Sequence, residues 1–417
     1  MRGWRSNPRG AEDYLLGLEL FGMRFGLDRM HRLMTVLGMP QRRFASVHVV
    51  GSNGKSSTTR MIAAILERHG LRAGSYTSPH LRSFSERIEV AGRPVADADF
   101  GGAVERAADA AALVDRTLAD DDRVTQFEAL TAAAYHELAR QKVDVAVIEA
   151  GLGGRYDATN VIPSRVQVLT GVALEHTRWL GPTLTNIAEE KLAVVPDHGH
   201  LVTGELPATA EAVAQRVARE RRARRTRAEA DPGELQLRAV GTAQRRNFAL
   251  AMAAAEAFVG QLDAAAVADA AASVSIPGRM EVVEHDPLVI YDGAHNPAAA
   301  SVLAQSLPDL VGARPLVALL GVLDDKDAAG ILAALLPLCR QAVYTRCESP
   351  RALPPATLQS LAAQRGAVPG EVVPSPRLAL DRARALAGTD GAVVATGSLH
   401  LISDLVRDRA RERASSL

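Results

Sequence analysis

The stretch FASVHVVGSNGKSSTTRMIAAILERHG, residues 44–70, decides the fold. Its first seven residues are mostly apolar and β-branched, which is typical of a buried parallel strand. The loop GSNGKSS follows at once, and the residues after it have helical periodicity as far as Gly70. A glycine-rich loop with a lysine between a strand and a helix is typical of phosphate binding, although only two residues separate Gly51 and Gly54 instead of the usual four. We expect Lys55 to reach the terminal phosphates, and Ser56 or Ser57 to offer a hydroxyl to Mg²⁺.

Lysine is scarce in this chain, which contains only Lys55, Lys142, Lys191 and Lys326. Lysine has a compact ammonium and an amine that can react, and arginine has neither. Three of the four lysines lie in motif-like surroundings. Lys142 lies between a predicted helix and a predicted strand, and we expect it to be an ordinary surface residue.

Length and composition limit the possible classes of protein. A chain of 417 residues is too long for one core, so two or more domains are expected. A formal net charge of zero argues against a nucleic-acid partner, and we expect the basic run at 216–227 to be a solvated helix face or an exposed loop. Cys339 and Cys347 cannot form a metal cage and make a disulfide framework unexpected. Neither a signal peptide nor a membrane-spanning run is apparent, so we expect a cytoplasmic protein with no membrane partner.

Polar residues follow two further predicted strands. Val143–Ile148 precedes Glu149, and Val166–Val172 precedes the pair Glu175-His176. The carboxyl ends of parallel strands face one crevice, where open α/β sheets bind ligands. Each of these side chains could be an ordinary strand-end residue, but together with the phosphate loop they favour a magnesium site.

The second half of the chain repeats this alternation. Pro287–Tyr291 is a predicted strand that leads into DGAHN at 292–296, where Asn296 caps a helix opened by Pro297. Further strands are expected at 315–320, 342–345 and 392–396. The sequence therefore predicts an α/β protein of two domains, 1–279 and 280–417, with a proline–glycine break at 277–278.

Several motifs together resemble one known family. They are GSNGKSS (51–57), YTSPHLRSFSERIEV (76–90), VAVIEAGLGGRYDATNVI (145–162), EHTRWLGPTLTNIAEEK (175–191), PGRMEVV (277–283), DGAHNPAAA (292–300), GVLDDKD (321–327) and TGSLHLISDL (396–405). From about residue 14 to 405 the chain resembles the Mur ligase superfamily and, within it, the bacterial dihydrofolate synthase/folylpolyglutamate synthase family.

The resemblance implies a fold and an activity. The fold would be an N-terminal P-loop Mur-ligase-type ATPase domain followed by a smaller Rossmann-like C-terminal domain. The activity would be ATP-dependent ligation of L-glutamate to a dihydropteroate or folate carboxylate through an acyl phosphate. Two alternatives remain, namely a superfamily ligase acting on another carboxylate and a catalytically silent nucleotide-binding module.

The resemblance also implies roles for individual residues. The positions that match ATP contacts are Asn53, Gly54, Lys55, Ser56, Ser57, Asn247, Arg279, Asp292 and His295. Those that match pterin or folate contacts are Thr125, Gln126, Phe127, Glu128, Tyr156, Asp157 and Ala158. Those that match magnesium ligands are Ser57, Glu149 and His176.

Lys191 matches a carbamylated lysine (N6-carboxylysine) that helps to hold a second Mg²⁺. Lys55, Glu149, His176 and Lys191 would then be the catalytic residues of an enzyme that we expect to be a monomer. The chain departs from the family pattern at Glu175, where aspartate is usual, and at residues 192–194, where Leu-Ala-Val replaces Ala-Gly-Ile.

Overall fold

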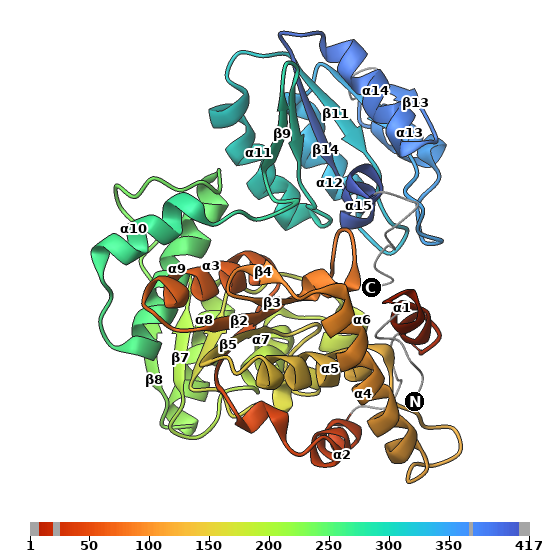
Figure 1. The fold of residues 1–417 in the computed structure, drawn as a ribbon. Helices are drawn as coiled ribbons and strands as arrows, with labels where there is room; N and C mark the ends of the chain where they lie inside the picture. Colours follow the sequence, from red (N-terminus) through yellow and green to blue (C-terminus); the bar gives the residue numbers. More distant parts are fainter. Residues whose placement is uncertain (1–7, 20–25, 367–369, 408–417) are drawn as a thin grey trace.

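Two β-sheets, each with its own helices, make up the computed structural model, which describes residues 8–19, 26–366 and 370–407 (Figure 1). The first sheet has eight strands in the order β4-β3-β2-β5-β1-β6-β7-β8. The second has six in the order β13-β12-β11-β14-β10-β9. The two-domain α/β architecture expected from the sequence is confirmed.

The first sheet is built around β1, with parallel neighbours on both sides. Val47 on β1 is paired with Val147 on β5 and with Val166 on β6. The strands of this sheet are β1 Ala45–Val50, β2 Ala73–Tyr76, β3 Ile88–Val90, β4 Arg93–Pro94, β5 Val145–Glu149, β6 Val166–Leu169, β7 His200–Thr203 and β8 Arg224–Arg227.

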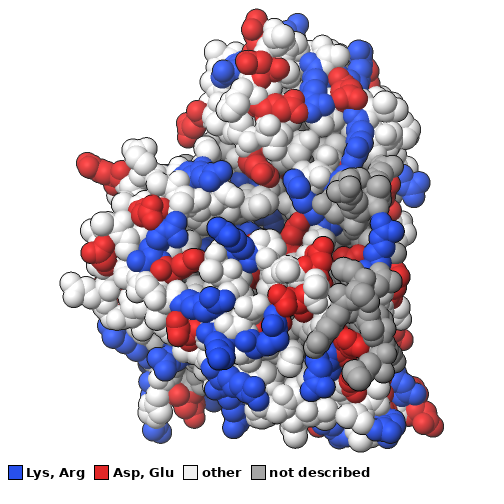
Figure 2. All heavy atoms as spheres, in the orientation of Figure 1, with Lys and Arg blue, Asp and Glu red and all other residues white. Residues whose placement is uncertain are grey.

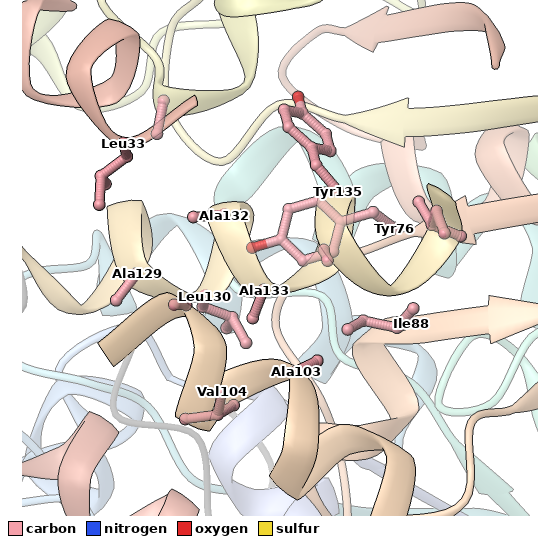
Figure 3. Packing of buried hydrophobic residues seen from close by; sticks show 14 of the residues in the cluster. Leu33, Tyr76, Ile88, Ala103, Val104, Ala129, Leu130, Ala132, Ala133 and Tyr135 are labelled. Carbon is pink, nitrogen blue, oxygen red and sulfur yellow. The ribbon is translucent and has the colours of Figure 1, made fainter. Parts of the chain in front are cut away.

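Alternating side chains of the first sheet pack against helices on both faces. Val47 and Val49 share one core with α3 Lys55–Arg68, α9 Thr242–Val259 and α10 Ala264–Ser273. The helices in the cores of the opposite face are α1 Pro8–Leu16, α2 Asp28–Val36, α4 Asp97–Asp115, α5 Gln126–Arg140, α7 Leu184–Leu192 and α8 Ala208–Glu220. Figure 3 shows Leu130 and Ala133 on the side of α5 that faces Ala103 and Val104 on α4, where the small alanine side chains let the helices pack closely.

The second sheet is mostly parallel, with β9 as an antiparallel edge strand. Its strands are β9 Glu281–His285, β10 Leu288–Tyr291, β11 Leu316–Leu320, β12 Gln341–Tyr344, β13 Gly370–Val372 and β14 Ala392–Thr396. One face packs against α11 Pro297–Val311, α12 Ala328–Leu335 and α13 Pro355–Ala363. The other face packs against α14 Pro376–Ala387 and α15 Leu399–Val406.

The basic run at 216–227 was only partly predicted. Part of it lies on α8, but Arg224–Arg227 forms the edge strand β8, which pairs in parallel with β7. The side chain of Arg225 is paired with Glu211 at 2.7 Å. Charged residues are a common feature of exposed sheet edges, because they disfavour pairing with another chain.

The loop at residues 77–87, orange in Figure 1, joins the two domains. Leu81 at its tip packs in the core of the second domain with Val289 and Leu401. The Ser403 hydroxyl donates a hydrogen bond of 2.5 Å to the carbonyl of Leu81. This contact fixes one end of the space between the domains.

Two further expectations concern the cysteines and membranes. Cys339 and Cys347 are both buried and free. Among the described residues, no helix combines the length and the apolar character needed to cross a bilayer.

Candidate active site

A cavity of about 1040 Å³ lies between the two domains and is lined by residues of both. Figure 2 shows the hollow between the upper and lower parts of the surface, with Lys and Arg side chains beside it. All the predicted ATP and magnesium positions line this cavity. Of the other predicted site residues, Gln126 and Lys191 do not line it.

The phosphate loop connects β1 to α3 and is shaped by its neighbours. Gly51 has φ of 148°, and a Cβ there would lie 2.0 Å from the Thr170 hydroxyl oxygen, so glycine is required. The same Thr170 hydroxyl donates to the carbonyl of Asn53 at 2.6 Å. Lys55 Nζ donates to the carbonyls of Gly51 and Ser52 at 3.0 and 3.3 Å. The loop is therefore preformed around the start of α3, where backbone N–H groups favour an anion.

Glu149 is the last residue of β5 and lies beside the phosphate loop. One carboxylate oxygen accepts from Ser56 Oγ at 2.9 Å, and the other accepts from the Ser78 backbone N–H at 3.1 Å. Burial raises the pKa of Glu149, and the charge of Lys55 opposes that shift. Of the two candidate serines, Ser56 contacts Glu149, whereas Ser57 lines the cavity without bonding to it. Ser78 was missed because its approach to Glu149 depends on the loop at 77–87.

The predicted metal ligands have a suitable chemical character. His176 lies in the left-handed region at φ of 46°, just before α6 Thr177–Leu180, and desolvation lowers the pKa of its imidazole. A neutral ring nitrogen can coordinate a metal. The described residues contain no group of three or more His, Cys, Asp and Glu side chains arranged for a metal. The hydroxyl of Ser57 and the carboxylate of Glu149 offer oxygen atoms, the ligand type that Mg²⁺ prefers.

Lys191 lies behind the phosphate loop, with only 1% of its surface exposed. Its Nζ donates to the Gly51 carbonyl at 2.9 Å and is ion-paired with Glu175 at 2.8 Å. Burial lowers the pKa of Lys191 to about 8, although Glu175 opposes this. Burial would raise the pKa of Glu175, but the charges of Lys191 and Lys55 outweigh it and lower that pKa to about 2. The amine of Lys191 is thus unusually easy to deprotonate.

The second domain contributes residues 292–296 after β10. Both oxygens of Asp292 accept backbone N–H groups, from Met280 at 2.9 Å and from Ala294 at 2.8 Å, so this carboxylate also shapes the turn. Burial raises its pKa. His295 Nδ1 lies 2.9 Å from the Gly293 carbonyl, and since a carbonyl only accepts, Nδ1 carries the proton. Burial lowers the pKa of His295 to about 4, which leaves Nε2 unprotonated at neutral pH.

The cavity continues from the phosphate loop to a partly apolar region between α9 and α11. Asn247 on α9 lies against Gly54, where a Cβ would come within 2.6 Å of the Asn247 amide oxygen. Beyond it the lining includes Leu206, Leu250 and Val302. Such a region can hold a flat, weakly polar group such as a nucleobase.

Lys326 also lines the cavity, on the side of the second domain. Its Nζ lies 2.9 Å from Asp325. Three of the four lysines therefore lie in the cavity or directly behind it, and Lys142 does not line it.

The wall opposite the nucleotide region is built from residues 125–128 and 156–158. Thr125 and Glu128 form a capping box at the start of α5, and Glu128 also accepts from Arg29 Nε at 2.9 Å. Gln126 is turned away from the cavity, since its Nε2 donates to the Leu15 carbonyl at 2.8 Å. Gln126 therefore does not line the cavity, because its amide ties α5 to Leu15, and its role in holding the pterin-bearing substrate stays a prediction.

Asp157 likewise bonds within the protein, accepting from the backbone N–H groups of Leu152 at 2.8 Å and Thr159 at 3.0 Å. Phe127 and Tyr156 present aromatic rings to the cavity, and Tyr156 is 48% exposed. The capping box could have been recognised in the sequence from its Thr-x-x-Glu spacing.

Comparisons with known proteins identify the family of this chain. The family described as "Mur ligase, glutamate ligase domain" matches residues 278–399. A Mycobacterium tuberculosis protein named dihydrofolate synthase/folylpolyglutamate synthase is 38% identical over 378 residues, which is 81% of this chain and 78% of that protein.

Two solved structures are also similar. Mycobacterium tuberculosis folylpolyglutamate synthase complexed with ADP has a TM-score of 0.89 and 34% identity, covering 96% of this chain and 97% of that one. A bifunctional folylpolyglutamate synthase/dihydrofolate synthase with Mn, AMPPNP and L-glutamate bound has a TM-score of 0.83 and 30% identity, covering 97% and 98%.

Proposed function

This chain belongs to the dihydrofolate synthase/folylpolyglutamate synthase family, and from that premise we propose that it uses ATP to join L-glutamate to the carboxylate of dihydropteroate, of a folate, or of both. One observation carries the proposal. A single cavity contains the phosphate loop, Glu149, the 292–296 turn and the aromatic side chains of Phe127 and Tyr156. The relatives crystallised with ADP, and with Mn, AMPPNP and L-glutamate, support the same ligands here.

The first step is phosphoryl transfer to the pterin-bearing acid. A carboxylate oxygen attacks the γ-phosphorus, the bond to the bridging oxygen breaks, and ADP leaves. Both reactants are anionic, so Lys55 and the N–H groups at the start of α3 neutralise their approach and hold them in line. A divalent cation at Ser57, Glu149 and His176 supplies further charge neutralisation when bound.

The second step forms the amide. The glutamate amine attacks the acyl carbon, a tetrahedral species collapses, and phosphate leaves with the original carboxylate oxygen. The proton that the amine loses leaves with the phosphate. His295, with Nε2 unprotonated at neutral pH, can accept a hydrogen bond from that amine and orient it.

Lys191 is proposed to act as a carbamate. Carbon dioxide adds only to a neutral amine, and the pKa of about 8 makes that form accessible. The new carboxylate would help to hold a second Mg²⁺. Arginine could not take this role.

Several coarser features complete the proposal. We propose that the protein is a monomer and acts in the cytoplasm. We place the domain boundary at 279/280, supported by the match that begins at residue 278 and by β9, which begins at Glu281. A ligase acting on a different acid is disfavoured by the names of the relatives, which specify folates.

The test is an assay of ADP release with each substrate omitted in turn, combined with product masses. We expect ADP release beyond one equivalent of enzyme to require both glutamate and a pterin-bearing acid, with a product heavier than that acid by one glutamyl residue. ADP release with another acid, and none with pteroate or folate, would support the alternative ligase. Binding of ATP without any turnover would support a silent module.

A further inference from the structure

The side chain of Asn296 makes two hydrogen bonds with different consequences. Its Oδ1 accepts from the backbone N–H of Ala299 at 2.8 Å, which caps α11. Its Nδ2 donates to Oδ1 of Asn53 at 3.1 Å, in the phosphate loop of the other domain. A helix cap needs only the first bond. The second bond therefore requires its own explanation.

The bond from Asn296 determines which polar group Asn53 can offer to a ligand. An amide side chain has an accepting oxygen and a donating NH₂ group. The oxygen of Asn53 is taken by Asn296, and Nδ2 has no protein partner in the part of the chain that the structure describes. Asn53 lines the cavity beside Lys55. Because phosphate oxygens only accept hydrogen bonds, Nδ2 is the group that an anion would use.

The backbone around Asn53 is held separately from its side chain. The Asn53 carbonyl accepts from Thr170 Oγ1 at 2.6 Å, and the Gly51 carbonyl accepts from Lys191 Nζ at 2.9 Å. With the backbone fixed, the side-chain amide can still turn over and exchange its oxygen and nitrogen. That exchange would direct an oxygen toward the phosphates and repel them.

We propose that Asn296 is a positioning residue for the nucleotide, which holds the Asn53 amide with its oxygen toward the second domain and its NH₂ group available to phosphate. The proposal rests on the nucleotide site of the proposed function. It adds that Asn296, which caps a helix in the second domain, determines which hydrogen-bond donor Asn53 presents in the phosphate loop of the first domain. The correct orientation of Asn53 then depends on the two domains being together.

Two substitutions separate this role from capping. Aspartate and serine both cap helices well, so Asn296→Asp and Asn296→Ser keep α11. The carboxylate of Asn296→Asp repels the oxygen of Asn53 and attracts its NH₂ group, which turns the amide over. We expect ADP affinity, measured by titration calorimetry, to fall roughly tenfold, the effect of losing one hydrogen bond to a charged group. Serine is too short to reach Asn53, and we expect a smaller loss of about threefold.

The control is the same change in an Asn53→Ala background, where there is no amide to turn. There Asn296→Asp should leave ADP affinity at the value of the Asn53→Ala variant. An equal loss in both backgrounds would mean that the new charge acts directly on the phosphates, and would overturn the proposal. So would wild-type ADP affinity in both Asn296→Asp and Asn296→Ser.

Two further outcomes can be told apart. If Asn296→Asp does not fold, as judged by its thermal unfolding, Asn296→Ser decides the question alone. If the wild-type protein itself does not bind ADP, the nucleotide site of the proposed function fails as well.

Discussion

The two walls of the cavity differ in how many of their polar side chains are bonded within the protein, although Lys55, Ser56 and Glu149 on the first of them are bonded too. On the nucleotide wall, defined as residues 51–57 with Glu149 and His176, several groups retain bonding capacity. Within the described residues, Asn53 Nδ2, the Ser57 hydroxyl and the His176 ring have no hydrogen-bond partner. On the substrate wall, defined as residues 125–128 and 156–158, the side chains of Thr125, Gln126, Glu128 and Asp157 are all bonded within the protein.

We interpret the difference as separating residues that we propose to act on a ligand from residues that support the wall of the cavity. A buried polar group with its bonds filled stabilises the fold, and breaking those bonds costs stability. A polar group that still has a free hydrogen-bonding position adds little to the stability of the fold and is available to a substrate. Changes on the nucleotide wall should therefore reduce turnover, and changes on the substrate wall should first reduce stability.

The largest effect should come from Lys191→Arg, directly behind the nucleotide wall. Arginine keeps the charge but cannot form a carbamate, and its larger head must fit where lysine is almost fully buried. We expect kcat to fall on the order of a thousandfold, the upper range for losing one charge-stabilising group. Thermal unfolding checks that the variant is folded.

Lys191→Ala provides a chemical control for that result. Short carboxylic acids added to Lys191→Ala should restore part of the activity by occupying the vacated space. Normal turnover by Lys191→Arg would show that Lys191 only donates a hydrogen bond to the Gly51 carbonyl and supports the loop.

Glu149→Ala and His176→Ala should each lower magnesium-supported turnover about a hundredfold, the scale for disturbing a metal site. His176 is exposed and lacks a hydrogen-bond partner in the described protein, so His176→Ala should barely change the unfolding midpoint. Steady-state rates over a range of Mg²⁺ concentrations are the measurement. Rates near those of the wild-type protein would show that these two side chains do not hold a cation.

The pH dependence of Lys191 carbamylation should have an intermediate effect. The pKa of Lys191 is lowered to about 8, so the neutral amine is the minor form below that pH. At a fixed concentration of dissolved CO₂, reactivation of CO₂-depleted enzyme should speed up about tenfold per pH unit below 8 and level off above it.

Glu175→Gln sharpens the pH prediction. The Glu175 carboxylate opposes the lowering of the Lys191 pKa, so its removal should lower that pKa further and move the plateau to lower pH. An unchanged profile in this variant, or a flat profile in the wild-type protein, would contradict the assignment.

Glu128→Ala should affect stability more than turnover. The change removes the capping box of α5 and leaves Arg29 without one carboxylate partner in a buried site. We expect the free energy of unfolding, measured by urea titration, to fall by about 3 kcal/mol. At a temperature where the variant is folded, kcat should stay within a few fold of the wild-type value. A hundredfold loss of kcat without loss of stability would place Glu128 among the catalytic residues.

The smallest effect should come from Lys142→Arg, the matched control for Lys191→Arg. Lys142 follows α5, does not line the cavity, and makes no side-chain hydrogen bond in the described protein. We expect the activation free energy and the free energy of unfolding each to change by less than about 0.5 kcal/mol. A clear loss of activity would mean that a lysine outside the cavity is also needed for function in this chain.

Much of the fold could be predicted from the sequence because its buried strands are continuous apolar runs. Such runs identified β1, β5, β10 and β14. The edge strand β8 was missed because its arginines lack that pattern. The predicted strand at 166–172 ends early, at Leu169, since Thr170 turns to bond the phosphate loop.

Residues of the candidate site could be predicted only where they belong to a local sequence motif. The GSNGKSS loop, Glu149 at the end of β5 and His176 before α6 all line one cavity, as their places in the sequence predicted, and their roles toward a ligand stay predictions. Ser78 and Thr170 depend on contacts between distant segments that no local pattern records. The direction of the Gln126 side chain could not be predicted for the same reason, since it is set by a bond to Leu15, far away in the sequence.

The most direct test of the proposed chemistry follows one oxygen atom. A folate or dihydropteroate whose carboxylate carries a heavy oxygen isotope is turned over with unlabelled ATP and L-glutamate, and the released phosphate is analysed by mass spectrometry. If the carboxylate attacks the γ-phosphorus and the amine then displaces phosphate, one labelled oxygen appears in each phosphate released. Unlabelled phosphate, formed together with the glutamylated product, would contradict an acyl phosphate and with it the division of roles between the nucleotide wall and the substrate wall.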